Sequence, residues 1–145
     1  MRSIFNTNYN HRNLDLILLV LRIGIALLML SHGIPKLTIL LNGEYTQFPD
    51  PMHIGAAASL VLAVFAEVGC SLLLLLGLAT RLAVIPLIIT MLMAVFVILG
   101  DAGLKEKELG LHFLLVYLLL LVAGAGRYSL DALINTRVNR ANRLY

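Results

Sequence analysis

Two charged side chains, Arg22 and Glu67, lie inside long apolar stretches of this sequence. A charge in hydrocarbon is unfavourable unless it is paired, so such residues usually mark function. A guanidinium can hold a carboxylate through two parallel hydrogen bonds. We interpret Arg22 and Glu67 in one of two ways. They form a structural ion pair that fixes two helices, or they form a site that accepts protons or binds a polar head group.

A second group of ionisable residues is expected at the outer ends of the apolar stretches: His32, Lys36, His53, Glu108 and His112. Histidine can pass protons, bind a quinone carbonyl or ligate a metal. Three interpretations stay open: interfacial histidines bonded to backbone or water, a pocket for a polar or quinone head group, and a metal or haem site. The histidines form no His-x-x-x-His pair and no Cys-x-x-Cys-His motif, so we assign no metal ligands.

Other polar residues give weaker signals. Tyr117 needs a partner for its hydroxyl if it is buried, and Arg81 lies in a short turn between two apolar stretches. Cys70 is the single cysteine, which excludes a disulfide framework and an iron–sulfur cluster held by this chain alone.

Four apolar stretches must position these residues. A helix needs about 20 apolar residues to cross a bilayer, and the sequence predicts spans at about 14–34, 54–79, 82–100 and 109–126, followed by a polar tail over 127–145. Hydrophobic residues make up 60% of the chain and charged residues 13%, against roughly 45–50% and 25% in soluble domains. We therefore predict an all-α fold: an integral membrane four-helix bundle forming one domain over 1–145, with the lipid bilayer as its first partner.

Charge placement predicts the orientation of the bundle. The net charge is +3, but the basic residues lie at the ends of apolar segments, which argues against a nucleic-acid partner. Three basic residues, Lys36, Lys105 and Lys107, fall on one side of a four-span protein. Because cytoplasmic loops are enriched in Lys and Arg, we expect both termini in the cytoplasm. Against three basic residues on the other side, the cytoplasmic side would then hold seven: Arg2, Arg12, Arg81, Arg127, Arg137, Arg140 and Arg143.

Helix geometry predicts that Arg22 and Glu67 meet. Arg22 is expected about 12 Å and Glu67 about 14 Å from the cytoplasmic ends of two antiparallel helices. Gly33-Ile34-Pro35 predicts a break or a kink near Ile34. The loop over 38–53 is long enough to fold over the outer face of the bundle. The tail is expected to form a short amphipathic surface helix with Leu130, Leu133 and Ile134 on one face.

Three motifs resemble the DoxX family of membrane proteins. Leu21-Arg22-Ile23 through Ser31-His32-Gly33-Ile34-Pro35-Lys36-Leu37 resembles the first helix of the family. Glu67-Val68-Gly69 with Leu76-Gly77-Leu78-Ala79-Thr80-Arg81-Leu82-Ala83 resembles its second motif, and Gly124-Ala125-Gly126-Arg127-Tyr128-Ser129-Leu130-Asp131 its Gly-x-Gly-x-x-Ser-Leu-Asp ending.

The resemblance implies a four-helix bundle in a prokaryotic inner membrane, and polar motif positions at Arg22, His32, Lys36, Glu67 and Arg81. One related branch supplies a subunit of thiosulfate:quinone oxidoreductase, and other members are associated with redox complexes. Two positions depart from the family pattern: Cys70 replaces a second glycine, and His112 replaces an outer-leaflet glutamate.

Our first hypothesis is a multi-pass subunit of a quinone-linked redox system. Arg22 and Glu67 would be the inner proton or anchoring pair, and His32 and His112 the outer hydrogen-bonding groups. A soluble or membrane redox partner would supply electrons, because the chain has no motif for flavin, nicotinamide, iron–sulfur or covalent haem. The alternative is a non-enzymatic membrane scaffold that docks a partner enzyme or assembles as a homo-oligomer. Transport of a small solute is a third hypothesis. No catalytic residue is assigned, and a quinone is the one cofactor considered.

Overall fold

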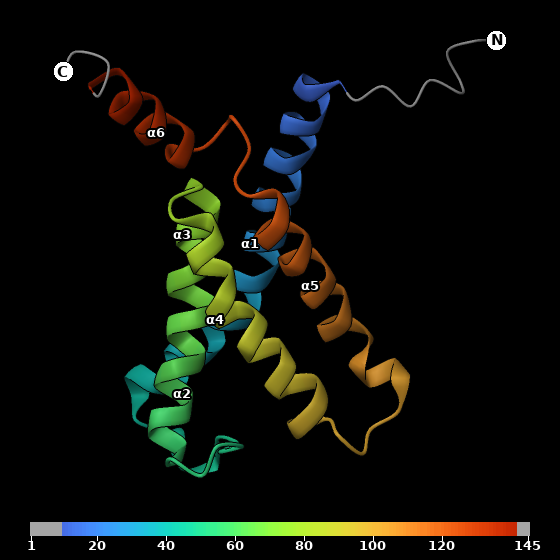
Figure 1. Ribbon diagram of the computed structural model, residues 1–145. Coiled ribbons are helices and arrows are strands. Elements are labelled where there is room, and N and C mark those ends of the chain that lie inside the picture. Colours follow the sequence, from blue (N-terminus) through green and yellow to red (C-terminus); the bar gives the residue numbers. More distant parts are fainter. Residues whose placement is uncertain (1–9, 142–145) are drawn as a thin grey trace.

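The computed structural model describes residues 10–141, with side chains over residues 10–137. Within this range every regular element is helical (Figure 1). The elements are the α-helices α1 (His11–Asn42), α2 (Ala56–Val64), α3 (Ser71–Leu76), α4 (Thr80–Leu92), α5 (Leu104–Ala123) and α6 (Leu130–Ala141), the 3-10 helix η1 (Tyr45–Gln47), and the π-helical segments η2 (Phe65–Cys70) and η3 (Met93–Ile98).

The expected four-helix membrane bundle is confirmed. Its four rods are α1, α2–η2–α3, α4–η3 and α5. The first three, His11–Asn42, Ala56–Leu76 and Thr80–Ile98, are long and apolar enough to cross a membrane. The fourth differs from expectation: α5 begins at Leu104 and ends at Ala123, so Glu108 lies within the helix and not in the preceding link.

The two ends of the bundle are different. The end that holds the start of α1, the α3–α4 turn and α6 is called the terminal end, and the end that holds η1 and the α4–α5 link is called the distal end (Figure 1). The predicted tail helix is present as α6, with Leu133 and Ile134 exposed. Arg2 and Arg143, used above to predict orientation, lie outside the described residues.

Of the break or kink predicted near Ile34, the break is wrong, because α1 continues through Pro35 to Asn42. In apolar surroundings no water competes for the backbone groups, so a helix is favoured even around a proline. The helix ends where Gly43 adopts φ 74° and the carbonyls of Ile39 and Leu40 receive the capping bonds.

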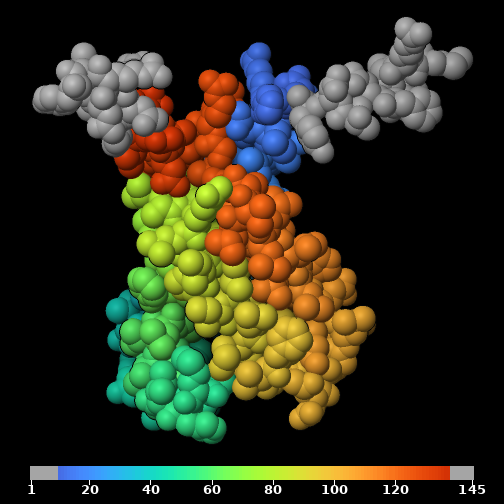
Figure 2. All heavy atoms as spheres, in the orientation of Figure 1, coloured from blue at the N-terminus to red at the C-terminus, as the bar shows by residue number. Residues whose placement is uncertain are grey.

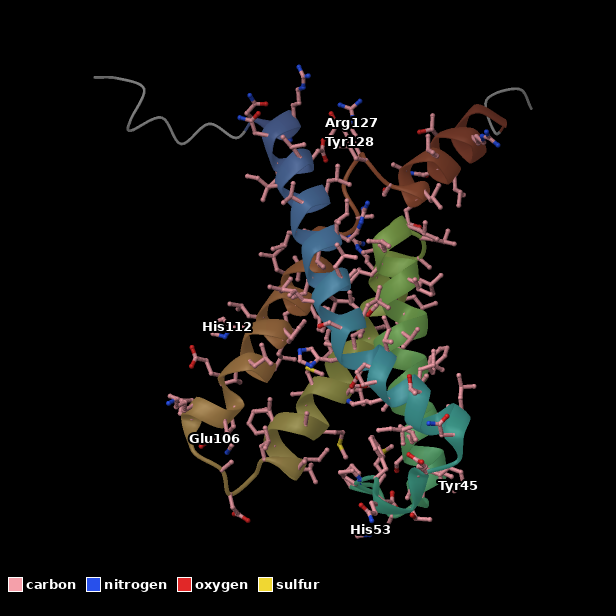
Figure 3. All side chains as sticks on the ribbon, turned by 180° about the vertical axis from the view of Figure 1, so that it is seen from behind. Tyr45, His53, Glu106, His112, Arg127 and Tyr128 are labelled. Carbon is pink, nitrogen blue, oxygen red and sulfur yellow. The ribbon has the colours of Figure 1, made fainter. Side chains whose placement is uncertain are left out.

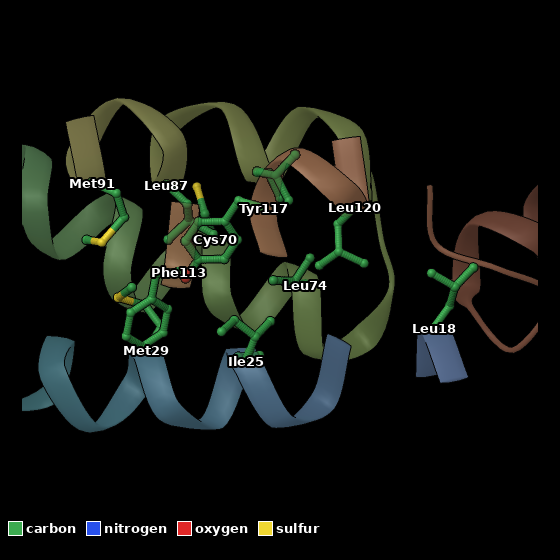
Figure 4. Packing of buried hydrophobic residues seen from close by; sticks show 13 residues of the cluster. Leu18, Ile25, Met29, Cys70, Leu74, Leu87, Met91, Phe113, Tyr117 and Leu120 are labelled. Carbon is green, nitrogen blue, oxygen red and sulfur yellow. The ribbon is translucent and has the colours of Figure 1, made fainter. Parts of the chain in front are cut away.

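Apolar side chains fill the interior and also cover the outside. Thirteen buried residues from α1, η2, α3, α4 and α5 form one core cluster, shown in Figure 4. On the outer surface Leu115 and Val122 of α5 are 67% and 80% exposed. A large apolar exterior over an apolar core is what a lipid-embedded bundle requires.

The loop folds across the distal end as the sequence predicted, but it spans residues 43–55 and not 38–53, because α1 continues to Asn42. Asp50 anchors it: its carboxylate accepts from the backbone N–H groups of Ile54 and Gly55 and from the Ser59 hydroxyl. The Ser59 hydrogen bond, followed by the backbone bonds, lowers the pKa of Asp50. This carboxylate therefore fixes the loop to the start of α2.

Candidate functional site

Glu67 forms an ion pair with Lys36. Lys36 Nζ of α1 lies 2.5 Å from Glu67 Oε1 of η2. The carboxylate is almost completely buried at 1% exposure, whereas the Lys36 side chain keeps 32%. The second carboxylate oxygen, Oε2, has no hydrogen-bond partner among the described residues. The site therefore contains a neutralised charge pair with one oxygen still able to accept a proton or a hydrogen bond.

Close packing of two helices at a glycine produces this pairing. A Cβ placed on Gly33 would lie 2.8 Å from Val68 Cγ2 and 2.9 Å from Glu67 Cβ. Only hydrogen fits there, so α1 approaches η2 closely at this level. Lys36 is three residues further along α1, nearly one turn, and reaches Glu67 from that position.

The predicted pairing of Arg22 with Glu67 is wrong. Arg22 is 2% exposed, and its guanidinium donates to backbone carbonyls at the terminal end. The Nη1 group bonds to Ala125 O at 2.6 Å, and the Nη2 group to Tyr128 O at 2.8 Å. Arg22 thus fixes the chain between α5 and α6.

Helix register explains the error. The prediction assumed that the first two spans begin level at the terminal end, but α1 extends well past the end of α3. A Cβ on Gly77 would lie 2.6 Å from Arg22 Nη1, so Arg22 lies level with Gly77. Glu67 is about 15 Å further from the terminal end along the second rod. The two charges belong to different layers of the bundle.

A cavity of about 570 Å³ opens in the distal half, and Lys36 and Glu67 both line it. Its walls are mostly apolar and come from all four rods and the 43–55 loop. In Figure 2 the surface is hollowed between α2 and η3. Its polar members are His32, Lys36, Ser59, Glu67, Thr90 and Glu106. Such a cavity, with a few convergent polar groups, has the character of a small-molecule site.

Both π-helical segments border this cavity. Glu67 lies in η2, and Ala94 and Val95 of η3 line the opposite wall. A π-helical turn widens the helix by one residue and is frequent at functional sites. Here the two wide turns face the same space.

The outer ionisable group does not gather as one pocket. His32 lines the cavity, and its ring meets that of Phe113 edge-on at 5.8 Å between centroids. His112 is exposed and its Nδ1 lies 2.7 Å from Glu108 O on the same helix. Figure 3 shows His112 on the outside of α5 and His53 in the distal loop. Of the predicted group, only His32 and Lys36 line the cavity.

Tyr117 is fully buried next to the site. Its ring stacks on Phe113 at 6.0 Å, and the charge of Glu67 acts on its hydroxyl. That hydroxyl and the hydroxyl of Ser71 have no hydrogen-bond partner among the described residues. Glu67 lines the cavity, whereas Ser71 and Tyr117 lie behind its wall in the core of the bundle.

The terminal end is held together by the residues of the last motif. Asp131 accepts from the backbone N–H groups of Ala79 and Thr80 at 2.7 and 2.9 Å, which caps the start of α4. Asp15 accepts from Arg127 N, and exposed Arg81 donates to Val122 O. The predicted position Arg81 is therefore structural in this arrangement and far from the cavity.

Metal ligation finds no geometric support: within the described residues no three His, Cys, Asp or Glu side chains are grouped to hold an ion. Sequence reasoning also missed part of the cavity wall, including Met52 and Thr90. Their types carry no signal of their own: Met52 becomes a wall residue through the folding of the distal loop, and Thr90 through the position of α4 in the bundle.

The comparisons point to one family. The family model described as DoxX matches residues 17–100, which is more than half of the chain and runs from α1 through η3. Neither a curated protein nor a solved structure matches the chain.

Proposed function

Since the chain belongs to the DoxX family of membrane proteins, we propose that it is the quinone-binding membrane subunit of a redox system. The observation that carries this is the largely apolar cavity of about 570 Å³ with the neutralised Lys36–Glu67 pair inside it. A neutral pair in an apolar cavity favours a neutral, lipophilic ligand with polar atoms at one end.

The residues fit the two ends of such a ligand. The Lys36 ammonium has three N–H groups and uses one on Glu67, so the others can donate to a quinone carbonyl. His32 lines the same cavity as a second polar group. Leu62 and Phe65 line it too and are about half exposed on the outer surface. An isoprenoid tail leaving between them would stay in hydrocarbon.

Proton exchange would be the chemical contribution of this chain. Reduction of a quinone to a quinol takes two electrons and two protons. In the ion pair the Lys36 ammonium can give one proton and the Glu67 carboxylate can accept one at Oε2, so the pair handles one of the two protons and the second would enter or leave through the cavity. The electrons would come from a partner protein that carries a redox cofactor.

The proposed setting is a prokaryotic inner membrane with the terminal end in the cytoplasm. Arg12, Arg81, Arg127 and Arg137 lie at that end, whereas Lys105 and Lys107 lie at the other. The bias follows the rule that cytoplasmic segments carry the excess of basic residues.

Equilibrium binding tests the proposal. Detergent-purified protein is titrated with a short-chain quinone analogue. Saturable binding is expected, and Glu67→Gln and His32→Ala should each abolish it. His112→Ala is the matched control, because His112 lies on the outer face of α5, and its binding should equal that of the wild type. Wild-type-like binding in both site variants would overturn the proposal.

A membrane scaffold is the second candidate, and α6 favours it. This helix lies beyond the bundle and exposes Leu133 and Ile134 beside polar residues. Such a helix could dock a partner or a second copy. Leu133→Ser combined with Ile134→Ser, which leaves the Asp131 cap of α4 in place, would then abolish co-purification of a partner or change the oligomeric mass, while quinone binding stays absent in every variant.

A further inference from the structure

Deepening the proposed function, we infer that the Lys36–Glu67 site exchanges protons only through the distal end of the bundle. The terminal side is closed by an apolar layer formed by Ile25, Leu74, Val84 and Leu120. Three observations support this inference. The buried polar atoms near Glu67 extend only one turn inward, the next layer is apolar, and the buried cation Arg22 lies beyond that layer.

On the cavity side of the apolar layer, the buried polar atoms without a partner extend only one helical turn inward from the ion pair. The other two such atoms among the described residues, Arg22 Nε and Thr80 Oγ1, lie beyond the layer at the terminal end. Glu67 Oε2, Ser71 Oγ and the Tyr117 hydroxyl are buried and have no hydrogen-bond partner among the described residues. Ser71 is four residues after Glu67 on the same rod, and the charge of Glu67 acts on Tyr117. Buried polar groups of this kind are ordinarily satisfied by water. Glu67 is the member of this set that lines the cavity, so protons are expected to reach the set through Glu67.

The next layer offers no polar group. Leu74, Val84 and Leu120 are 0% exposed and Ile25 is 9% exposed, one residue from each of the four rods. All belong to the core cluster, and Figure 4 shows Ile25, Leu74 and Leu120 between the helices. About 9 Å of helix separates Ser71 from Gly77. A proton cannot cross such a layer without water or a titratable side chain.

A fixed cation lies beyond the layer. Arg22 is buried at the level of Gly77 and is held by the carbonyls of Ala125 and Tyr128. A buried positive charge on a path repels protons, as arginines do in channels that exclude them. Arg22 therefore adds an electrostatic barrier to the apolar one.

The titratable groups around Glu67 are all on the distal side of this layer. Lys36 and His32 face the cavity from α1, Glu106 lines it from α5, and Cys70 is on η2 itself. Tyr117 of α5 is buried beside them. The parts of α2, α4 and η3 that line the cavity contribute no titratable side chain.

Sided chemical labelling tests the inference without any quinone. Full-length protein is reconstituted in vesicles, and its orientation is read from protease cleavage of an N-terminal tag. A lipophilic carbodiimide adds only to a protonated carboxyl group, and the adduct rearranges to a stable N-acylurea that mass spectrometry locates at Glu67. The pH is then changed on one side at a time.

The labelling rate of Glu67 is expected to follow the distal pH, by up to about tenfold per unit, and to ignore the terminal pH. A rate that follows the terminal pH, or neither pH, overturns the inference. Leu74→Ser should make the rate follow both sides, whereas Leu72→Ser should not, because Leu72 is 46% exposed on the outer surface. If Leu74→Ser does not fold, the wild-type measurement alone decides. Failed quinone binding would leave this result intact, so the two proposals fail separately.

Discussion

Lys36 and Glu67 join α1 to the π-helical segment η2 through a 2.5 Å contact at the cavity. The pair neutralises a carboxylate that is 1% exposed. Removing one partner leaves the other charge buried and alone, which is more unfavourable than losing the contact itself.

Lys36→Met should therefore lower the free energy of unfolding by about 3 kcal/mol. This value is the lower end of the range for breaking a buried ion pair, and we choose it because the Lys36 side chain keeps 32% exposure. Adding Glu67→Leu should restore most of the loss, because no unpaired charge then remains. Denaturant titration in detergent measures both. The exposed residue Lys105 provides the control as Lys105→Met. Equal losses in the single and double variants would contradict the account.

Gly33→Ala should separate α1 from η2. The added methyl group would lie 2.8–3.0 Å from Val68 and Glu67 atoms, and overpacking of this kind lowers stability by about 1–3 kcal/mol. Gly24→Ala on the same helix is the matched control, because nothing lies within 4 Å of its Cβ position. Thermal unfolding compares the two. A Gly33→Ala variant as stable as Gly24→Ala would show that the helices are not in close contact there.

Arg22→Met should release the chain between α5 and α6. It removes two hydrogen bonds from a buried guanidinium, to Ala125 and Tyr128, and we expect a loss of about 3 kcal/mol. Hydrogen exchange of residues 124–132 should accelerate, while exchange in η2 stays unchanged. Acceleration in η2 of equal size would instead support an Arg22–Glu67 pair. Arg81→Met, which removes an exposed bond to Val122, should have a smaller effect.

Acid should weaken the anchor of the distal loop. Hydrogen bonds from Ser59, Gly55 and Ile54 lower the pKa of Asp50 in the folded protein. A lowered folded pKa means that the stabilisation is complete above the unfolded pKa, about 4, and is lost as pH falls through the folded value. The melting temperature of Asp50→Asn should thus lie below that of the wild type at pH 6, and the gap should close in acid. A gap that is constant down to pH 2, or that matches Asp101→Asn, would contradict this.

Much of the fold could be predicted from the sequence, because apolar length and charge placement act locally. The four rods and the tail helix follow from those signals. The start of α5 could not be placed, since Lys105 to Glu108 are as compatible with a helical turn as with a polar link.

The partners of the buried charges could not be predicted in the same way. The partners depend on the axial offset between α1 and the second rod, and no local pattern in the sequence predicts that offset. The close contact at Gly33 sets Lys36 beside Glu67 and leaves Arg22 level with Gly77. The sequence indicates that Gly33 is a small residue suited to close helix packing, but it does not predict that Gly33 contacts Glu67 and Val68.

Photolabelling tests the proposed quinone site most directly. A photoreactive quinone analogue is irradiated with the membrane-embedded protein, with and without excess unlabelled quinone, and the adducts are located by mass spectrometry. We predict displaceable adducts on η2 and η3, where the cavity wall is formed, and their loss in His32→Ala. Adducts confined to the outer face of α5 around His112, or labelling that excess quinone does not displace, would contradict the account.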